Sequence, residues 1–203
     1  EGNIFHDTYR GEVRARRLSA RAEPLGAPLM PLHATQIQYE ALFNPIAPGT
    51  PVGYSYPQPH IAMDGAGNFV VAWTEAPEEA GPALSLGLGN VYFRRFAADG
   101  TPLGEISSTG LLAEPNSPNI AMAPDGRFVV TWRYNAVLAQ AYAADGTPAG
   151  ALPAVVATPL DDPLLLASNI LRYAVAMAAD GSYIVSWHSD SESLSALRAR
   201  IYR

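Results

Sequence analysis

Three polar residues of types that take part in acid–base and ionic chemistry come shortly after recurring tryptophans. They are Glu75, Arg133 and His188, each at most two residues beyond a tryptophan. If each tryptophan ends a strand, these side chains form a ring of polar groups that could face a central pocket. Polar residues that begin a solvent-exposed loop after each strand would give the same pattern. A pocket and a set of exposed loops therefore both remain open.

Two pairs of adjacent acids could supply a general acid and a general base. These are Glu78-Glu79 and Asp161-Asp162. Two carboxyl groups can share the proton transfers of a hydrolase when they flank its substrate. Adjacent acids in loops usually face water instead, so the sequence predicts no catalytic residue and a chain that is not an enzyme.

The Asp-Gly pairs, among them Asp125-Gly126 and Asp180-Gly181, have the residue types of a calcium loop. A calcium loop also needs carboxylates at alternating positions, and these pairs lack them. We therefore interpret them as tight turns. The sequence predicts no metal site and no cofactor.

The tryptophans Trp73, Trp132 and Trp187 occupy one position of a repeated motif. Indole rings can stack on sugars, so three of them could line a glycan site. A position that recurs in every copy of a repeat is also the one that packs against neighbouring copies. We expect these rings to be core residues.

Two motifs alternate along the chain and show it to be a repeat protein. The first occurs at 59–73, 118–132 and 173–187, as in PNIAMAPDGRFVVTW. The second occurs at 11–26, 89–104 and 135–150, as in GNVYFRRFAADGTPLG. Self-similarity at roughly 45–60 residues is the mark of stacked supersecondary units.

Each unit is predicted to be two β-hairpins. In the segment Phe69–Trp73 the side chains alternate between two apolar faces, which predicts a strand in a sheet covered on both sides. Asp-Gly between short apolar runs predicts a tight hairpin turn, because glycine accepts positive φ. After the second turn, 102–104 is expected to begin a short edge strand, which tolerates proline.

The sequence therefore predicts an all-β fold, a β-propeller-like array of four-stranded antiparallel meander blades. About four blades are expected within one domain over 1–203, and a linear solenoid or a sandwich are the alternatives. The N-terminal strand, residues 2–9, could close the ring by pairing with 196–202. The expected units are 1–30 (partial), 59–107, 118–156 and 173–203 (partial), with 31–58 as an inserted loop.

Composition narrows the possible partners. The chain has 48% hydrophobic residues, enough for a sizeable core, and a net charge of −6. Its densest basic cluster, within 14–21, is too short to follow a phosphate backbone, so a nucleic acid partner is not expected. No apolar run approaches the roughly 18 residues of a membrane-spanning helix.

The repeats resemble those of bacterial exported proteins that read A-x-x-x-D-G-x-F-V-V-x-W and then V-x-x-x-x-F-x-x-D-G-x-P-L-G. The resemblance covers most of 11–30, 59–107, 118–151 and 173–203. A more distant similarity is to the Asp-box hairpins of sialidase-type propellers, in which one residue separates Asp from Gly. The repeat family implies export to the periplasm, the cell surface or the medium, and a binding or structural role.

The hairpin turns should lie at one end of each blade and the variable connections at the other, which is where repeat proteins usually bind. The Tyr54–Pro57 stretch is the most interface-like, because tyrosine and proline give rigid contact area.

We expect a non-catalytic binding or structural domain in an exported assembly, with a protein partner; the alternatives are a glycan-binding lectin and a propeller glycoside hydrolase. Peripheral membrane association through a partner is also possible. The predicted binding face comprises Tyr54, Tyr56, His60, Glu75, Arg133, Tyr134 and His188. The wider surface at that end adds Tyr39, Glu78, Glu79, Asp161, Asp162 and Asp190.

Overall fold

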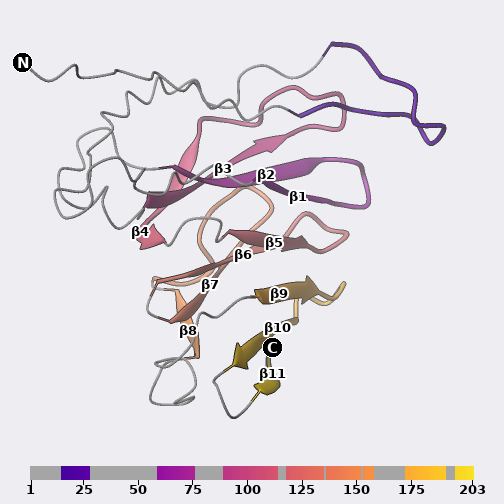
Figure 1. Ribbon diagram of the computed structural model, residues 1–203. Coiled ribbons are helices and arrows are strands. Elements are labelled where there is room, and N and C mark those ends of the chain that lie inside the picture. The colour runs from indigo at the N-terminus through magenta and orange to yellow at the C-terminus, as the bar shows by residue number, and fades with distance from the viewer. Residues whose placement is uncertain are drawn as a thin grey trace, which may run out of the picture.

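The computed structural model is an all-β structure, which confirms the predicted class. It describes residues 15–27, 59–75, 89–113, 118–134, 136–151, 153–157, 172–190 and 195–203. These residues form eleven strands in three antiparallel sheets and contain no helix. The sheets follow one another down the molecule in Figure 1.

Each sheet is an antiparallel meander in which neighbours along the chain pair with one another. Sheet 1 has the order β1-β2-β3-β4 and sheet 2 the order β5-β6-β7-β8. Sheet 3 has three described strands in the order β11-β10-β9, so β11 is an edge. The strands are β1 (His60–Met63), β2 (Phe69–Glu75), β3 (Gly89–Phe96), β4 (Ser107–Ala113), β5 (Asn119–Met122), β6 (Phe128–Arg133), β7 (Val137–Tyr142), β8 (Ala154–Ala157), β9 (Arg172–Met177), β10 (Tyr183–Asp190) and β11 (Ser195–Tyr202).

The fourth strand of a unit does not begin where the sequence suggested. Pro102 makes only an isolated bridge to Phe96, and β4 starts at Ser107. Pro102 cannot donate a ladder hydrogen bond, and Gly104 then turns the chain away with φ 103°. The position of β4 was predicted wrongly because its sequence, SSTGLLA, has no apolar alternation.

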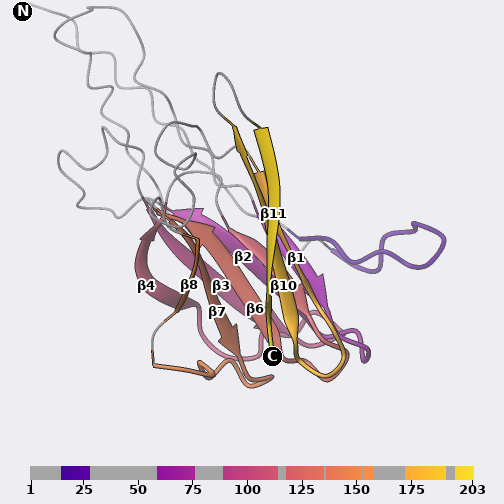
Figure 2. The ribbon, with the colours of Figure 1, turned by 90° about the horizontal axis from the view of Figure 1, so that it is seen from below.

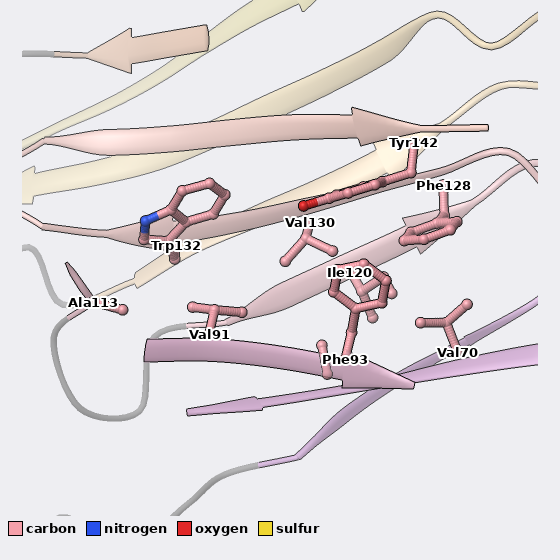
Figure 3. Packing of buried hydrophobic residues seen from close by; sticks show 10 residues of the cluster. Val70, Val91, Phe93, Ala113, Ile120, Phe128, Val130, Trp132 and Tyr142 are labelled. Carbon is pink, nitrogen blue, oxygen red and sulfur yellow. The ribbon is translucent and has the colours of Figure 1, made fainter. Parts of the chain in front are cut away.

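Alternating side chains bury both faces of β2 and β6. In β2, Val70 and Ala72 belong to the core cluster shared with Phe128, Val130 and Trp132 of sheet 2. Figure 3 shows this layer between the two sheets. The other face of β6 packs with sheet 3, through Val129 against Val185 and Trp187. The three tryptophans are buried core residues.

A stacked aromatic pair joins the second and third strands of every sheet. The ring centroids are 5.0 Å apart in Phe69–Phe96, 4.9 Å in Phe128–Tyr142 and 4.8 Å in Tyr183–Tyr202. Cross-strand aromatic pairs fix register, because each ring packs only when its partner lies opposite. Burial raises the pKa of the Tyr142 hydroxyl to about 12.

The N-terminal segment 15–27 has the backbone of a second-hairpin turn. The bridge Leu18–Pro24 takes the aligned place of Phe96–Pro102 and Tyr142–Pro148. Ala22, with φ 60°, stands where the other two turns have Gly100 and Gly146 with φ 91° and 88°. Ala15 packs against the cluster of Phe69, Val71, Trp73 and Phe96, on the side of sheet 1 away from sheet 2. The expected pairing of residues 2–9 with β11 lies outside the described residues.

Candidate functional site

The hairpin turns at one end of the sheets use their aspartates to hold their own backbone. Asp64 Oδ1 accepts from the Ala66 and Asn68 amides, both at 2.8 Å. Asp180 Oδ1 accepts from the Ser182 amide at 2.9 Å and hydroxyl at 2.6 Å. These Ser182 hydrogen bonds hold the pKa of Asp180 below its usual value. The aspartates thus stabilise the turns.

Arginines connect each turn to the turn of the next sheet. Arg95 Nη1 donates to the carbonyl of Ala144 at 2.7 Å, and Arg17 Nη1 to that of Asp99 at 2.6 Å. Arg127 pairs with Asp125 at 2.7 Å and donates to the Asp180 carbonyl at 3.1 Å. These contacts align the turns at one end of the sheets. The connections of variable length start from the opposite end.

A shallow hollow of about 130 Å³ lies between the turns of sheets 1 and 2. Asp64, Arg95 and Asp125 line it with apolar neighbours. Its two carboxylates already accept hydrogen bonds from Asn68 and Arg127. The hollow is therefore built from groups that hold the turns together.

Five of the seven predicted binding residues lie in the described structure, at the end opposite the turns. His60 begins β1, Glu75 ends β2, Arg133 ends β6 with Tyr134 next to it, and His188 lies within β10. His60 pairs with Ala72, so Glu75 lies three residues, or roughly 10 Å, beyond it along β2. Burial lowers the pKa of His60.

Strand alternation separates the two residues expected to share a pocket, Arg133 and His188. Arg133 shares a face with Val129, which packs toward sheet 3. His188 shares a face with Ile184, on the side of sheet 3 that points away from sheet 2. Sheet 3 thus lies between the two side chains. His188 is also inside β10, which continues to Asp190, and not just past its end.

The remaining predicted residues lie outside the described part of the chain. These are Tyr39, Tyr54, Tyr56, Glu78, Glu79, Asp161 and Asp162. Asp190 is the last residue of β10.

Sequence reasoning missed an exposed apolar surface on sheet 3. On the side away from sheet 2, β9, β10 and β11 present six exposed apolar residues, here called the end face. Ile184 is 39% exposed, Leu197 79% and Ile201 62%. The end face comprises Ala174, Ala176, Ile184, Leu197, Ala199 and Ile201. In Figure 2, β10 and β11 lie on the near side, unobscured by other strands.

Within the described ranges, no cluster of three or more His, Asp or Glu side chains is placed to hold a metal ion. The same part of the chain has no helix long and apolar enough to cross a membrane.

Comparisons with known proteins give weak similarity to solved structures alone. No family model and no curated protein matches the chain. One similar solved structure is an endo-arabinase from Bacteroides thetaiotaomicron VPI-5482, with 14% identity and a TM-score of 0.37. The match covers 79% of this chain and 63% of the endo-arabinase chain, so this chain spans less than two thirds of that protein.

Proposed function

We propose that the three sheets are blades of a propeller-like array, with β1, β5 and β9 innermost. Two contacts between first hairpins support this arrangement. The Gly65 amide donates to the Pro124 carbonyl at 3.1 Å, and Asn119 Nδ2 to the Tyr173 carbonyl at 3.3 Å. The inner strands carry alanines, Ala62 and Ala121, that pack in the clusters between the sheets.

We infer that the chain acts by binding, as an accessory subunit of an exported protein assembly. The end face is the observation that carries this proposal. Large apolar patches on a protein surface mark sites where another protein, a membrane or a ligand binds, and a protein partner fits a role in an assembly. Two of its residues, Leu197 and Ile201, are more than half exposed, so a protein partner that buries them gains hydrophobic free energy.

Site-specific photocrosslinking in the producing bacterium tests this proposal. A photoreactive phenylalanine analogue replaces Leu197 on the end face or, as a matched control, Leu103 near the turn end, which is 39% exposed. The expected result is a discrete adduct with another protein from position 197 and none from position 103. Equal adducts from both positions, or none from 197, contradict the proposal.

Purified protein assayed on a glycan array and on glycoside and ester substrates separates the rival functions. The accessory-subunit proposal expects neither a glycan signal nor turnover. Specific glycan binding without an adduct at 197 makes the protein a lectin. Reproducible turnover makes it an enzyme. Either result overturns the proposal.

A further inference from the structure

Leu197 and Ile184 of the end face hold positions that are buried twice inside the chain, whereas Arg95 and Ala141, the counterparts of Ile201, are only partly buried. Leu197 has the register position of Val91 in β3 and Val137 in β7, both fully buried, whereas Leu197 is 79% exposed. Ile184 likewise stands at the position of Val129, which is fully buried. In sheets 1 and 2 this side is covered by the sheet that follows.

The covering surface has the same chemistry at both internal interfaces. Sheet 2 covers sheet 1 with an aromatic residue, a valine and a tryptophan at alternating positions of β6: Phe128, Val130 and Trp132. Sheet 3 covers sheet 2 with the matching residues of β10: Tyr183, Val185 and Trp187. We call this pattern the aromatic stripe. It faces valines and alanines on the covered sheet and, in sheet 1, also Phe93, whose ring lies edge-on to Phe128 at 5.4 Å.

A second copy of the chain has no free aromatic stripe to offer among its described residues. The stripe of sheet 1, Phe69, Val71 and Trp73, is buried on the N-terminal side of the stack. The stripes of sheets 2 and 3 are packed in the internal interfaces against sheets 1 and 2. The occupant must therefore bring a stripe of its own.

We propose that the end face is the docking surface for a further β-sheet of the same repeat type, supplied by a partner polypeptide that carries an aromatic stripe. This inference rests on the proposed role in an assembly and specifies the chemistry of the partner. Its basis is continuity with the two internal interfaces. On the same side of sheet 3, β10 also carries Ser186 and His188 next to the six apolar residues.

The test uses the full chain with a sheet from its own sequence as the probe. Tyr202 has the register position of Phe96, so a second copy of residues 97–157 can follow Tyr202 directly and supply a fourth strand and then a sheet 2. The chain has no cysteine, so Leu197→Cys gives a single thiol at an end-face position whose counterparts, Val91 and Val137, are fully buried. Its reaction with a maleimide reports whether the face is covered.

In the extended chain, the thiol at 197 should react at least about tenfold more slowly than in the unextended chain, since labelling then requires local opening. The matched control carries aspartate at the copies of Phe128 and Trp132 in the extension, and its thiol should react as fast as in the unextended chain. Leu103→Cys, away from the end face, should react equally fast in all three chains.

Three results would overturn the inference. One is an extension that stays sensitive to proteases, because a repeat unit needs a neighbour to fold against. Another is an extension that folds but leaves the thiol at 197 reacting as fast as in the unextended chain. The third is a dimer of the unextended chain that Ile201→Asp dissociates, since the occupant would then be a second copy. If the thiol-labelling test fails but position 197 still crosslinks to a partner, the proposed function stands and only this inference is lost. If position 197 gives no adduct, both the proposed function and this inference are contradicted.

Discussion

At the scale of single residues, Ala22 is strained in a way that its repeat counterparts are not. It adopts φ 60° where Gly100 and Gly146 stand. A left-handed conformation costs an L-residue with a Cβ roughly 1–2 kcal/mol, and glycine avoids this cost. We predict that Ala22→Gly raises the free energy of unfolding by about 1 kcal/mol, after subtraction of the larger unfolded-state entropy of glycine.

Urea denaturation measures this change, and Ala20→Gly in the same turn is the control. Ala20 does not have a positive φ, so its replacement should lower stability by several tenths of a kcal/mol. Equal effects at the two positions would show that the conformation of Ala22 is not the cause.

Trp132 is the residue whose loss should cost most. It is fully buried between sheets 1 and 2 in the cluster with Val91 and Ala113 (Figure 3). We predict that Trp132→Ala lowers the free energy of unfolding by about 3–5 kcal/mol, because it leaves a large cavity. Leu103→Ala, at a partly exposed position, should cost well under about 1 kcal/mol. Similar costs in thermal or denaturant melts would contradict the assignment of core and surface.

At the scale of elements, the arginine contacts between turns predict an energetic coupling between Arg127 and Gly181. A Cβ added at Gly181 would meet the Arg127 guanidinium, which donates to the Asp180 carbonyl. Gly181→Ala should therefore cost more than Gly26→Ala, where a Cβ meets nothing within 4 Å and φ is also positive. The excess should be about 0.5–1 kcal/mol, the worth of exposed hydrogen bonds.

A double-mutant cycle checks the source of that excess. In an Arg127→Ala background, Gly181→Ala should cost the same as Gly26→Ala, because the clash and the lost hydrogen bonds are already gone. An unchanged difference would mean that Arg127 does not connect the turns of sheets 2 and 3.

The turn aspartates predict a loss of stability in acid. Hydrogen bonds from Ser182 lower the pKa of Asp180 in the folded state. A carboxyl whose folded pKa is depressed contributes stability above its unfolded pKa and loses it as the pH falls through the folded value. Between pH 5 and pH 2, Asp180→Asn should lose stability less steeply than the unmodified protein, with Ser182→Ala between them. Parallel curves in denaturant melts would contradict this role.

The elements also show what the sequence could and could not predict. Asp-Gly turns and alternating apolar residues located the hairpins around 64–68 and 123–127, because both signals are local. The fourth strand of the first unit was expected at 102–104 and lies at Ser107–Ala113, because β4 is held by pairing to β3 and not by its own pattern. The separation of Arg133 from His188 depends on how sheets stack, which a strand's own sequence does not specify.

At the scale of the whole molecule, the stack has two different ends. On sheet 3 the end face exposes Ile184, Leu197 and Ile201. On sheet 1, β1 exposes Ile61 and Met63 on the side away from sheet 2. No single unit could have revealed either surface, because all units carry similar residues there. Exposure follows from which neighbours are present.

The most direct test of the stacked repeat is to compare the oxidation of its three aligned methionines. Met63, Met122 and Met177 hold the same motif position, but Met63 is 60% exposed while the other two pack into the clusters between sheets. Oxidation of a methionine follows the exposure of its sulfur. Peptide-resolved mass spectrometry of the native protein under mild peroxide should find Met63 oxidised several-fold faster than Met122 and Met177. Equal rates at the three sites would contradict the stacking order of the sheets.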